Sequence, residues 1–289
     1  MSKVDTYERR IHDIFPELSI EKIKLNDTGS ENDIIEVNDE LIFRFPKHEI
    51  GIKKLNKEVQ ILKLIKKYIT LNIPRIFYEH REVVGYFMIC GVDLSKDLLG
   101  ELDEKTQQLA ANQLATFLKE LHNVPKSRIL LSDIYDSGVT HKYKDWGDLY
   151  QRLSEEAFQQ GVDSTQELDK SHLVSFLNKE SNFDYEPKLI HGNLGECHIL
   201  FDKQKNCISG IIDFGTAGLG DPAIDIAILI HNYGEAFVSR LYQIYPEVDL
   251  YLKRAKFYAE TFALPWVLSG IKSRDITEFL RHLGGSYKS

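Results

Sequence analysis

The segment from residue 189 to residue 225 constrains the fold of this chain more than any other part of its sequence. It reads LIHGNLGECHILFDKQKNCISGIIDFGTAGLGDPAID. Apolar runs separated by polar turns predict a strand, a loop, a β-hairpin and the beginning of a helix. The turns between these elements carry His191 with Asn193, then His198, and then Asp213. A fold built on this segment therefore presents polar, chemically active side chains on three successive turns.

His198 and Asp213 predict a magnesium site. Asp213 follows the apolar run 208–212, and a carboxylate at a strand end is the hard oxygen ligand that Mg²⁺ prefers. A hairpin turn at residues 203–207 brings His198 beside it, and imidazole, although a less usual ligand of Mg²⁺, binds through a neutral nitrogen. Phosphoryl transfer from a nucleotide needs such a cation. Cys197 beside His198 raises zinc as an alternative, but no second pair of Cys or His has ligand spacing.

The motif order HGN, HIL and DFG in this segment resembles the catalytic core of the aminoglycoside phosphotransferase family, a branch of the protein-kinase-like fold. The runs IFRFPKH and NKEVQILK are similar to aminoglycoside 2''-phosphotransferases, and FYAETFALPWVLSGI is similar to macrolide kinases. The resemblance implies an α+β fold of two lobes. We expect a nucleotide-binding N-lobe with a five-stranded antiparallel sheet over residues 1–90. A mainly helical C-lobe, over residues 91–289, would hold the catalytic loop and the acceptor.

The catalytic loop departs from the family at its third position. The family writes H-x-D there, and its Asp accepts a hydrogen bond from the acceptor hydroxyl and can take its proton. This chain has His191 and then Asn193, whose amide is nearly isosteric with Asp but is neutral and a much weaker base. Two interpretations stay open: Asn193 is native to a low-activity or non-catalytic relative, or it results from an inactivating Asp→Asn exchange. The intact remainder of the motifs slightly favours the second.

Strand patterns fill the amino-terminal third of the chain, behind a short helix predicted over residues 3–15. The pair Asn38-Asp39 is a two-residue hairpin signal. Five apolar runs predict an antiparallel sheet, at residues 20–25, 34–37, 41–45, 75–80 and 84–90.

Arg44 is the candidate phosphate ligand on the third strand. Phe43 and Phe45 flank it, so alternation along the strand puts its side chain on the opposite face. By the resemblance, Arg44 takes the place of the kinase Lys that contacts the α- and β-phosphates, held by Glu58 on the following helix. A guanidinium can bridge phosphate and carboxylate. Lys47 is the alternative phosphate contact, or a solvated loop residue.

Two further segments are candidates for the nucleotide site. The loop 27–32 lies where a kinase covers the phosphates, and although it carries no G-x-G-x-x-G, Ser30 and its backbone N–H groups can contact phosphate. The end of the fifth strand resembles the hinge between the lobes. The resemblance places Met88 and Cys90 at the purine edge.

The rest of the chain is helical by its pattern. His122 is expected to be a structural residue at a helix end, and Asp225 resembles a family carboxylate that braces the catalytic loop. By the same resemblance, Glu235 and Glu260 are candidates for an anionic acceptor cleft. Asp221-Pro222 predicts a helix start. Further helices are predicted near residues 142–160, 165–181, 235–245, 248–268 and 274–283.

Composition limits the class of protein. The chain has 289 residues, of which 43% are hydrophobic and 28% charged, as expected for a globular protein. Its formal net charge of −8 argues against nucleic-acid binding and is compatible with cationic substrates. The first residues are charged, no apolar run is long enough for a membrane span, and three cysteines are too few for a disulfide framework. We therefore expect a cytoplasmic protein. We also expect it to be a monomer or weak dimer.

The sequence as a whole predicts an antibiotic kinase that transfers the γ-phosphoryl group of GTP or ATP to a hydroxyl of an aminoglycoside, with Mg²⁺ as cofactor. One alternative keeps the fold and changes the acceptor to a macrolide or a small metabolite. The other is a non-catalytic protein that binds nucleotide or drug, in which Asn193 is native.

Overall fold

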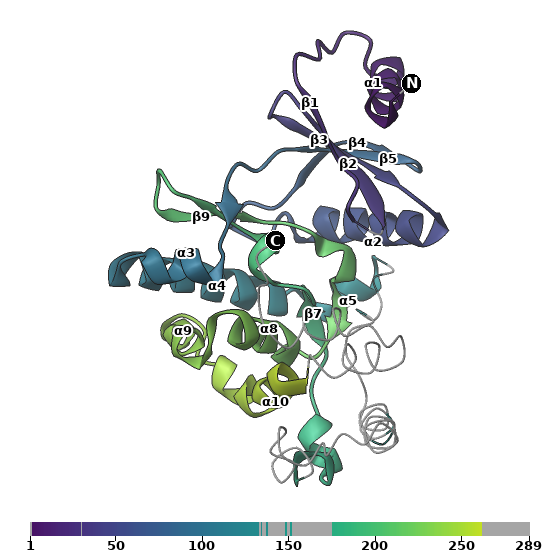
Figure 1. The fold of residues 1–289 in the computed structure, drawn as a ribbon. Coiled ribbons are helices and arrows are strands. Elements are labelled where there is room, and N and C mark those ends of the chain that lie inside the picture. Colours follow the sequence, from purple (N-terminus) through teal and green to yellow (C-terminus); the bar gives the residue numbers. More distant parts are fainter. Residues whose placement is uncertain are drawn as a thin grey trace, which may run out of the picture.

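The computed structural model describes residues 2–29, 31–132, 134, 137, 148, 151 and 175–261, and the following account is confined to them. A five-stranded sheet lies at one end of the molecule, and helices with two smaller sheets lie at the other (Figure 1). This is the α+β arrangement in two lobes that the sequence predicts.

The N-lobe sheet has the strand order β1-β2-β3-β5-β4, and every neighbouring pair is antiparallel. All five predicted strands are present, although β5 ends at Phe87 rather than at residue 90. The elements are α1 (Lys3–Ile14), β1 (Ile23–Asn26), β2 (Asn32–Val37), β3 (Leu41–Pro46), α2 (Glu49–Ile65), β4 (Arg75–His80) and β5 (Val83–Phe87).

Alternation along β3 decides what each face of the sheet carries. Phe43 and Phe45 are buried on one face together with Ile11 of α1, whereas Arg44 points to the other face, toward α2. Figure 1 shows α1 and α2 on opposite sides of the sheet. The turn between β2 and β3 has the predicted two-residue form, because Asn38 and Asp39 both have positive φ, 55° and 53°.

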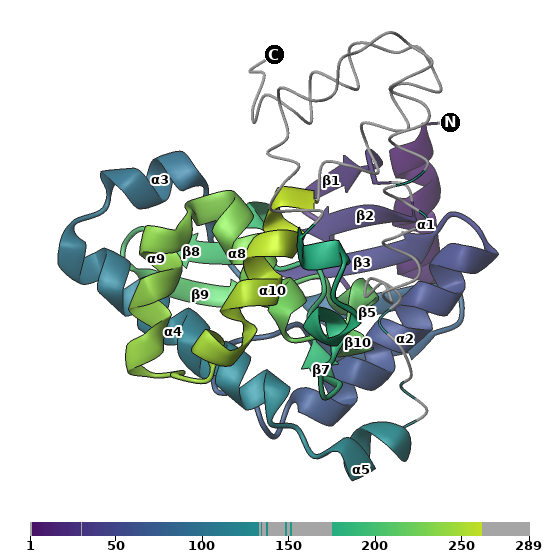
Figure 2. The ribbon, with the colours of Figure 1, turned by 90° about the horizontal axis from the view of Figure 1, so that it is seen from below.

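The C-lobe surrounds a long helix, α4, whose apolar stripe is fully buried. The hairpin β8–β9 packs on α4 (Figure 2), and α8 packs against α10. Its elements are β6 (Val92–Asp93), α3 (Lys96–Glu101), α4 (Glu104–His122), α5 (Lys126–Leu130), β7 (Lys188–Ile190), β8 (Ile199–Asp202), β9 (Cys207–Ile211), β10 (Gly218–Gly220), α8 (Ala223–Tyr233), α9 (Glu235–Ser239) and α10 (Val248–Thr261).

The prediction of one continuous helix over residues 235–245 is wrong. The chain forms α9 and then a 3₁₀ turn from Arg240 to Gln243. Side chains of α4 donate hydrogen bonds to backbone carbonyls of this stretch. Gln108 donates to the Arg240 carbonyl at 3.3 Å, and Lys119 donates to the Ile244 carbonyl at 3.2 Å. These tertiary hydrogen bonds compete with the helical ones.

The helix predicted to start at Asp221-Pro222 begins at Ala223. The N-cap is therefore Pro222 rather than Asp221, although the Asp221 carboxylate accepts a hydrogen bond from the Ala223 N–H at 2.9 Å. The helix predicted over residues 248–268 is described as far as Thr261. The described residues do not include the rest of this helix or the predicted helix at 274–283. Of the predicted helices at 142–160 and 165–181 they include only a small part.

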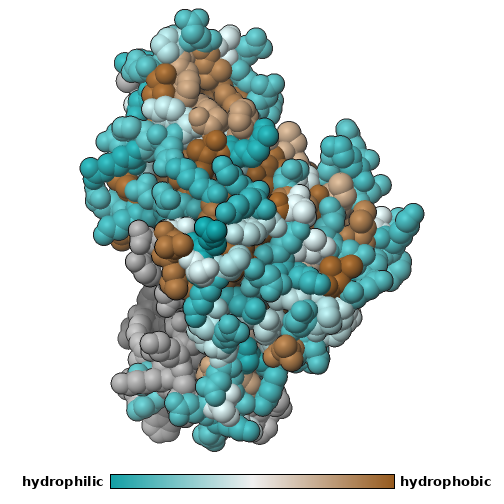
Figure 3. Space-filling view, turned by 180° about the vertical axis from the view of Figure 1, so that it is seen from behind, coloured by the Kyte–Doolittle hydropathy of each residue, from teal (hydrophilic) through white to brown (hydrophobic). Residues whose placement is uncertain are grey.

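The surface shown in Figure 3 carries mostly hydrophilic side chains, with hydrophobic ones in small groups. Within the described part of the chain, none of the helices has both the length and the apolarity required to cross a lipid bilayer.

We expect Gly210→Ala to destabilise the junction between β9 and the segment that joins the lobes. A Cβ at Gly210 would lie 2.8 Å from the Asn72 carbonyl oxygen and 2.9 Å from Cγ2 of Ile89. Overpacking of this kind costs about 1–3 kcal/mol in the free energy of unfolding, which urea denaturation measures.

Gly100→Ala is the matched control. Gly100 is in α3, and a Cβ there meets no atom within 4 Å. Because Ala forms helix better than Gly, we expect this exchange to be neutral or to stabilise by about 0.5–1 kcal/mol. Equal effects of the two exchanges would contradict the packing described for β9.

Candidate active site

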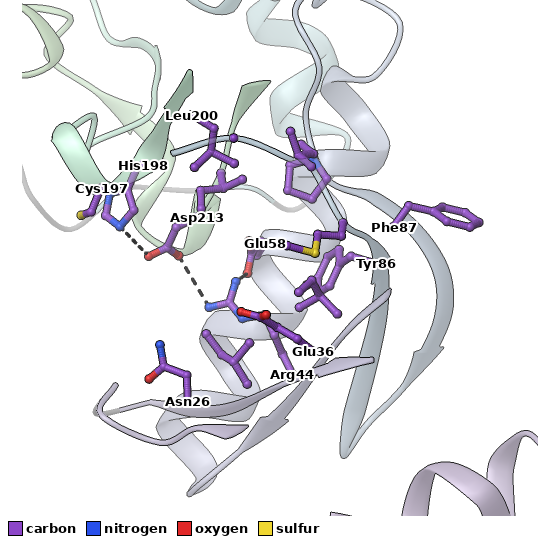
Figure 4. Close-up of a pocket in the computed structure, with 17 residues that line it drawn as sticks. Asn26, Glu36, Arg44, Glu58, Tyr86, Phe87, Cys197, His198, Leu200 and Asp213 are labelled. Atoms are coloured by element: carbon purple, nitrogen blue, oxygen red, sulfur yellow. Dashed lines mark hydrogen bonds and ion pairs between the residues drawn. The ribbon is translucent and has the colours of Figure 1, made fainter. Parts of the chain in front are cut away.

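A cavity of about 440 Å³ lies between the N-lobe sheet and the hairpin β8–β9 (Figure 4). Its lining combines apolar side chains with three acidic residues, a guanidinium and an imidazole. The lining residues are Asn26, Ile34, Glu36, Ile42, Arg44, Glu58, Pro74, Tyr86, Phe87, Met88, Ile89, Gly91, Cys197, His198, Leu200, Ile212 and Asp213.

The apolar part of the cavity has two walls. Ile34 and Ile42 come from β2 and β3, and Leu200 with Ile212 come from the hairpin of the C-lobe. Such a slot between two aliphatic surfaces can hold a flat ring by dispersion and the hydrophobic effect. Tyr86 closes it: its side chain is 3% exposed and lines the cavity.

An ion pair between β3 and α2 forms the polar end of the cavity. Nη1 of Arg44 lies 2.6 Å from Oε2 of Glu58, and Nη2 lies 3.6 Å from Oδ1 of Asp213. Glu58 is 1% exposed and also accepts from the Phe214 N–H at 3.3 Å. The partnership predicted between Arg44 and Glu58 is therefore present, and Asp213 joins it.

The pKa values at this end follow from burial and charge. Burial raises the pKa of Glu58, against the opposing effect of Arg44. Burial would also raise the pKa of Asp213, but the charges of Arg44 and His198 outweigh it and hold that pKa below its usual value. Asp213 therefore stays ionised at neutral pH and can face a cation.

Asp213 adopts an unusual backbone conformation. Its φ of 64° lies in the left-handed region, which residues other than Gly, Asn and Asp rarely adopt. This conformation ends β9 and starts the 3₁₀ turn Phe214–Thr216. The sequence predicted the Asp at the strand end but not this conformation.

His198 connects the catalytic loop to Asp213. Its Nδ1 donates to the Asn193 carbonyl at 2.6 Å, and its Nε2 lies 3.3 Å from Oδ2 of Asp213. Burial lowers the pKa of His198, but Cys197 and Asp213 raise it to about 9. The hairpin therefore brings His198 beside Asp213, as the sequence predicts.

His191 is fully buried at the start of the catalytic loop. Its Nε2 donates to the Ile212 carbonyl at 3.1 Å, and its Nδ1 accepts from the Asn193 N–H at 3.3 Å. Burial lowers its pKa to about 4, against the nearby charge of Asp225, so the ring is neutral at pH 7. Both ring nitrogens are thus used within the protein.

Asp225 braces this loop, as the sequence predicts. Its carboxylate accepts from the backbone N–H groups of His191 at 2.9 Å and Gly192 at 2.8 Å. The same carboxylate is hydrogen-bonded to Nε2 of His122 at 3.1 Å, and Nδ1 of His122 lies 2.9 Å from the Tyr245 hydroxyl. His122 is a buried residue at the end of α4, as expected.

Asn193 is exposed at the tip of the loop. Its backbone N–H is hydrogen-bonded to His191 and its carbonyl to His198. Residue 193 is therefore accessible from solvent.

The two residues predicted for the hinge lie differently from each other. Met88 lines the cavity, and its backbone N–H donates to the Glu40 carbonyl at 2.7 Å. Cys90 is exposed and is not among the lining residues, whereas Ile89 and Gly91 are.

The two acidic residues predicted for the acceptor cleft are not among the lining residues of the cavity. Glu235 and Glu260 are exposed in the C-lobe, and Glu235 pairs with Lys256 at 2.6 Å. Ser30 lies outside the described residues. Sequence reasoning missed Asn26 and Glu36, which line the cavity. Alternation from Arg44 across the paired strands would have placed both on its face of the sheet.

Residues 22–258 match the sequence model of a family described as the phosphotransferase enzyme family. The chain belongs to this family. The family resemblance seen in the sequence is thereby confirmed, together with the kinase-like fold and the prediction of a phosphotransferase that acts on hydroxyl groups.

Individual proteins are similar to this phosphotransferase over most of its length. The GDP complex of a mutant of aminoglycoside 2'-phosphotransferase-IIIa has a TM-score of 0.84 and 27% sequence identity, over 97% of this chain and 95% of that one. Macrolide 2'-phosphotransferase type I has a TM-score of 0.70 and 19% identity, over 100% and 99%. The uncharacterised protein YcbJ of Bacillus subtilis is 22% identical over 243 residues, 78% of this chain and 76% of that protein.

We expect His191 to make the phosphotransferase less stable in mild acid. Its pKa is about 4 in the folded state against 6.5 ordinarily, so the unfolded chain binds the proton more tightly. The stability from the neutral ring is complete above pH 6.5 and falls as the pH drops toward 4, by up to about 3 kcal/mol. Denaturation at several pH values measures it.

The comparison is with His191→Gln, which retains a donor for the Ile212 carbonyl but does not titrate. Its stability should fall less steeply than that of the wild type between pH 6.5 and 4. Parallel curves would show that His191 does not titrate as described.

Proposed function

We propose that this phosphotransferase is an antibiotic kinase that uses GTP or ATP to phosphorylate a hydroxyl of an aminoglycoside. In this proposal the nucleotide base occupies the apolar slot, and the phosphates extend toward Arg44 and Asp213. The N-lobe, over residues 1–90, and the C-lobe, over residues 91–289, each supply one wall. Its cytoplasmic location and its state as a monomer or weak dimer stay predictions from the sequence.

One observation carries the proposal: Arg44, held by Glu58, and Asp213, held beside His198, face each other at one end of an apolar cavity. A guanidinium suits phosphate oxygens, and a carboxylate suits the cation that neutralises them. Phosphoryl transfer depends mainly on such positioning and charge neutralisation.

The residues present fit Mg²⁺. In the described part of the chain no three His, Cys, Asp or Glu side chains gather to hold a metal, so protein ligands alone do not form a cage. Mg²⁺ typically takes one or two protein ligands together with phosphate oxygens and water. Asp213 would be one such ligand. Nε2 of His198 would be another only after it releases the proton that its raised pKa favours, since the Asn193 carbonyl holds the other proton on Nδ1. The cation would neutralise charge on the transferred phosphoryl group.

Asn193 would meet the acceptor hydroxyl. Its amide oxygen can accept a hydrogen bond from that hydroxyl but cannot take its proton. We therefore propose that this chain is a low-activity or inactivated form. His191 would act by positioning the loop, since both its ring nitrogens are bonded within the protein.

An aminoglycoside acceptor is favoured over a macrolide by sequence similarity. The aminoglycoside enzyme bound to GDP is 27% identical to this chain, and the macrolide enzyme is 19% identical. GDP in that complex also supports a guanine nucleotide as one of the donors. Glu260 and Glu235 would attract ammonium groups of the acceptor, although Glu235 would have to exchange Lys256 for the ligand.

We expect nucleotide binding to survive despite Asn193, because its determinants lie elsewhere. Calorimetry with GTP and with ATP, in excess Mg²⁺ and in chelator, tests this. Asp213→Ala should abolish the Mg²⁺-dependent part of the affinity. Cys197→Ser is the matched control, since Cys197 also lines the cavity, and it should leave affinity nearly unchanged. No binding of either nucleotide at millimolar concentration would refute the proposed function.

We expect Asn193→Asp to raise turnover by at least ~10²-fold, the lower end of what a positioned general base contributes. Acceptor affinity should change much less, because the two side chains are nearly the same size and the gain appears in the transition state. The acceptor is chosen first from a thermal-shift panel of aminoglycosides and macrolides with Mg²⁺-nucleotide. Steady-state kinetics then compare both forms.

Equal turnover by the two forms would show that residue 193 is not the base position. Inactivity of both forms would favour the alternative of a non-catalytic nucleotide- or drug-binding protein.

A further inference from the structure

Helix α1 is tied by side chains to the loop between β1 and β2. Nζ of Lys3 lies 3.1 Å from Oδ2 of Asp27 and 3.0 Å from Oδ1 of Asp33. One turn further along, the Tyr7 hydroxyl donates to Oδ2 of Asp33 at 2.5 Å. The Tyr7 ring also packs on Phe45, with centroids 4.6 Å apart, which fixes its place on the sheet.

Asp33 is the centre of these contacts. Its side chain is only 4% exposed, and a buried carboxylate needs partners to stay charged. Burial acts to raise its pKa, but the Tyr7 hydroxyl and the Lys3 ammonium group lower it further than burial raises it. Burial and Asp33 raise the pKa of Tyr7 to about 12. The pair therefore carries a fixed negative charge at neutral pH.

Lys47 faces this charge and holds the loop. Its Nζ lies 3.4 Å from Oδ1 of Asp33 and donates to the carbonyls of Asp27 at 2.7 Å and Gly29 at 2.5 Å. Its backbone N–H donates to the Glu31 carbonyl at 2.9 Å. Lys47 is thus neither a solvated side chain nor a free phosphate ligand: its ammonium group binds the backbone of the loop.

The loop held in this way adjoins the nucleotide cavity. Asn26, immediately before it, and Ile34, in the strand after it, both line the cavity, and Figure 4 shows Asn26 facing the end where Arg44 and Asp213 lie. A flexible loop loses conformational entropy when it closes on a ligand, so a loop already ordered by the protein binds with less loss.

We propose that Tyr7, Asp33 and Lys47 are positioning residues that hold the loop containing Asp27–Gly29 and Glu31 in place over the phosphates of the nucleotide. None of the three touches the reacting atoms. Helix α1 would contribute to phosphate binding from the far side of the sheet. This inference rests on the proposed function, since it requires a nucleotide in the cavity.

The test separates phosphate binding from general stability. Calorimetry measures the dissociation constants of GTP and ATP, with Mg²⁺, and of guanosine and adenosine, which lack phosphates. Lys47→Met should weaken the bound triphosphate about ten-fold, the loss expected for a charged hydrogen bond. The same exchange should change nucleoside binding by less than about two-fold, within the ordinary effect of a surface substitution.

Tyr7→Phe is a milder variant that keeps the ring on Phe45 and removes one hydroxyl. It should weaken triphosphate binding in the same selective way and speed amide hydrogen exchange in the loop. Lys22→Met is the matched control, because Lys22 forms an exposed ion pair with Asp39 at the hairpin between β2 and β3. This exchange should change the dissociation constants of neither the triphosphates nor the nucleosides.

Three outcomes would overturn the inference. Equal weakening of triphosphate and nucleoside would show a structural role only. Unchanged binding in Lys47→Met and Tyr7→Phe would show no role in nucleotide binding. Failure of the wild type to bind any nucleotide would refute the proposed function and the inference with it. The first two outcomes concern only the variants and would leave the proposed function standing.

Discussion

The ion pair between Arg44 and Glu58 joins the three parts of the molecule that form the site. Arg44 comes from the sheet, Glu58 from α2, and Asp213, 3.6 Å from the guanidinium, from the end of the C-lobe hairpin. Glu58 also accepts from the Phe214 N–H, so one carboxylate holds both the sheet and the segment that follows Asp213. Loss of one partner would leave the other charge buried without compensation, which makes this pair a strong constraint on the arrangement of the lobes.

A second buried carboxylate does the same for the catalytic loop. Asp225 accepts two backbone N–H groups from the loop and a hydrogen bond from His122, so α8 and α4 share one anchor. His191 and His198 then connect the loop to the hairpin through carbonyl groups. The exposed tip at Asn193 is therefore the end of a rigid frame, and exchange of its amide for a carboxylate would alter chemistry more than geometry.

The sequence predicted most of the fold because its signals are local. Strand alternation placed Arg44 opposite Phe43 and Phe45, and the Asn38-Asp39 pair predicted the hairpin turn. The predictions that were wrong fall where distant residues compete for the backbone. The helix after Gly234 stops at Ser239 because α4 side chains bind its continuation, and the hinge leaves strand geometry at Phe87. No local pattern carries that information.

The sequence by itself determined which side chains lie on the turns of the catalytic segment, because their spacing between apolar runs follows from strand and hairpin periodicity. Only the tertiary structure decided what each of them contacts. In the structure the His198 ring lies between the Asn193 carbonyl and Asp213. Met88 lines the cavity whereas Cys90 does not, and the Lys47 ammonium group binds the loop before β2. The places of His198 and Lys47 depend on polar groups that meet their partners only in the folded chain, and the energy of an unpaired buried polar group is large enough to override local preference.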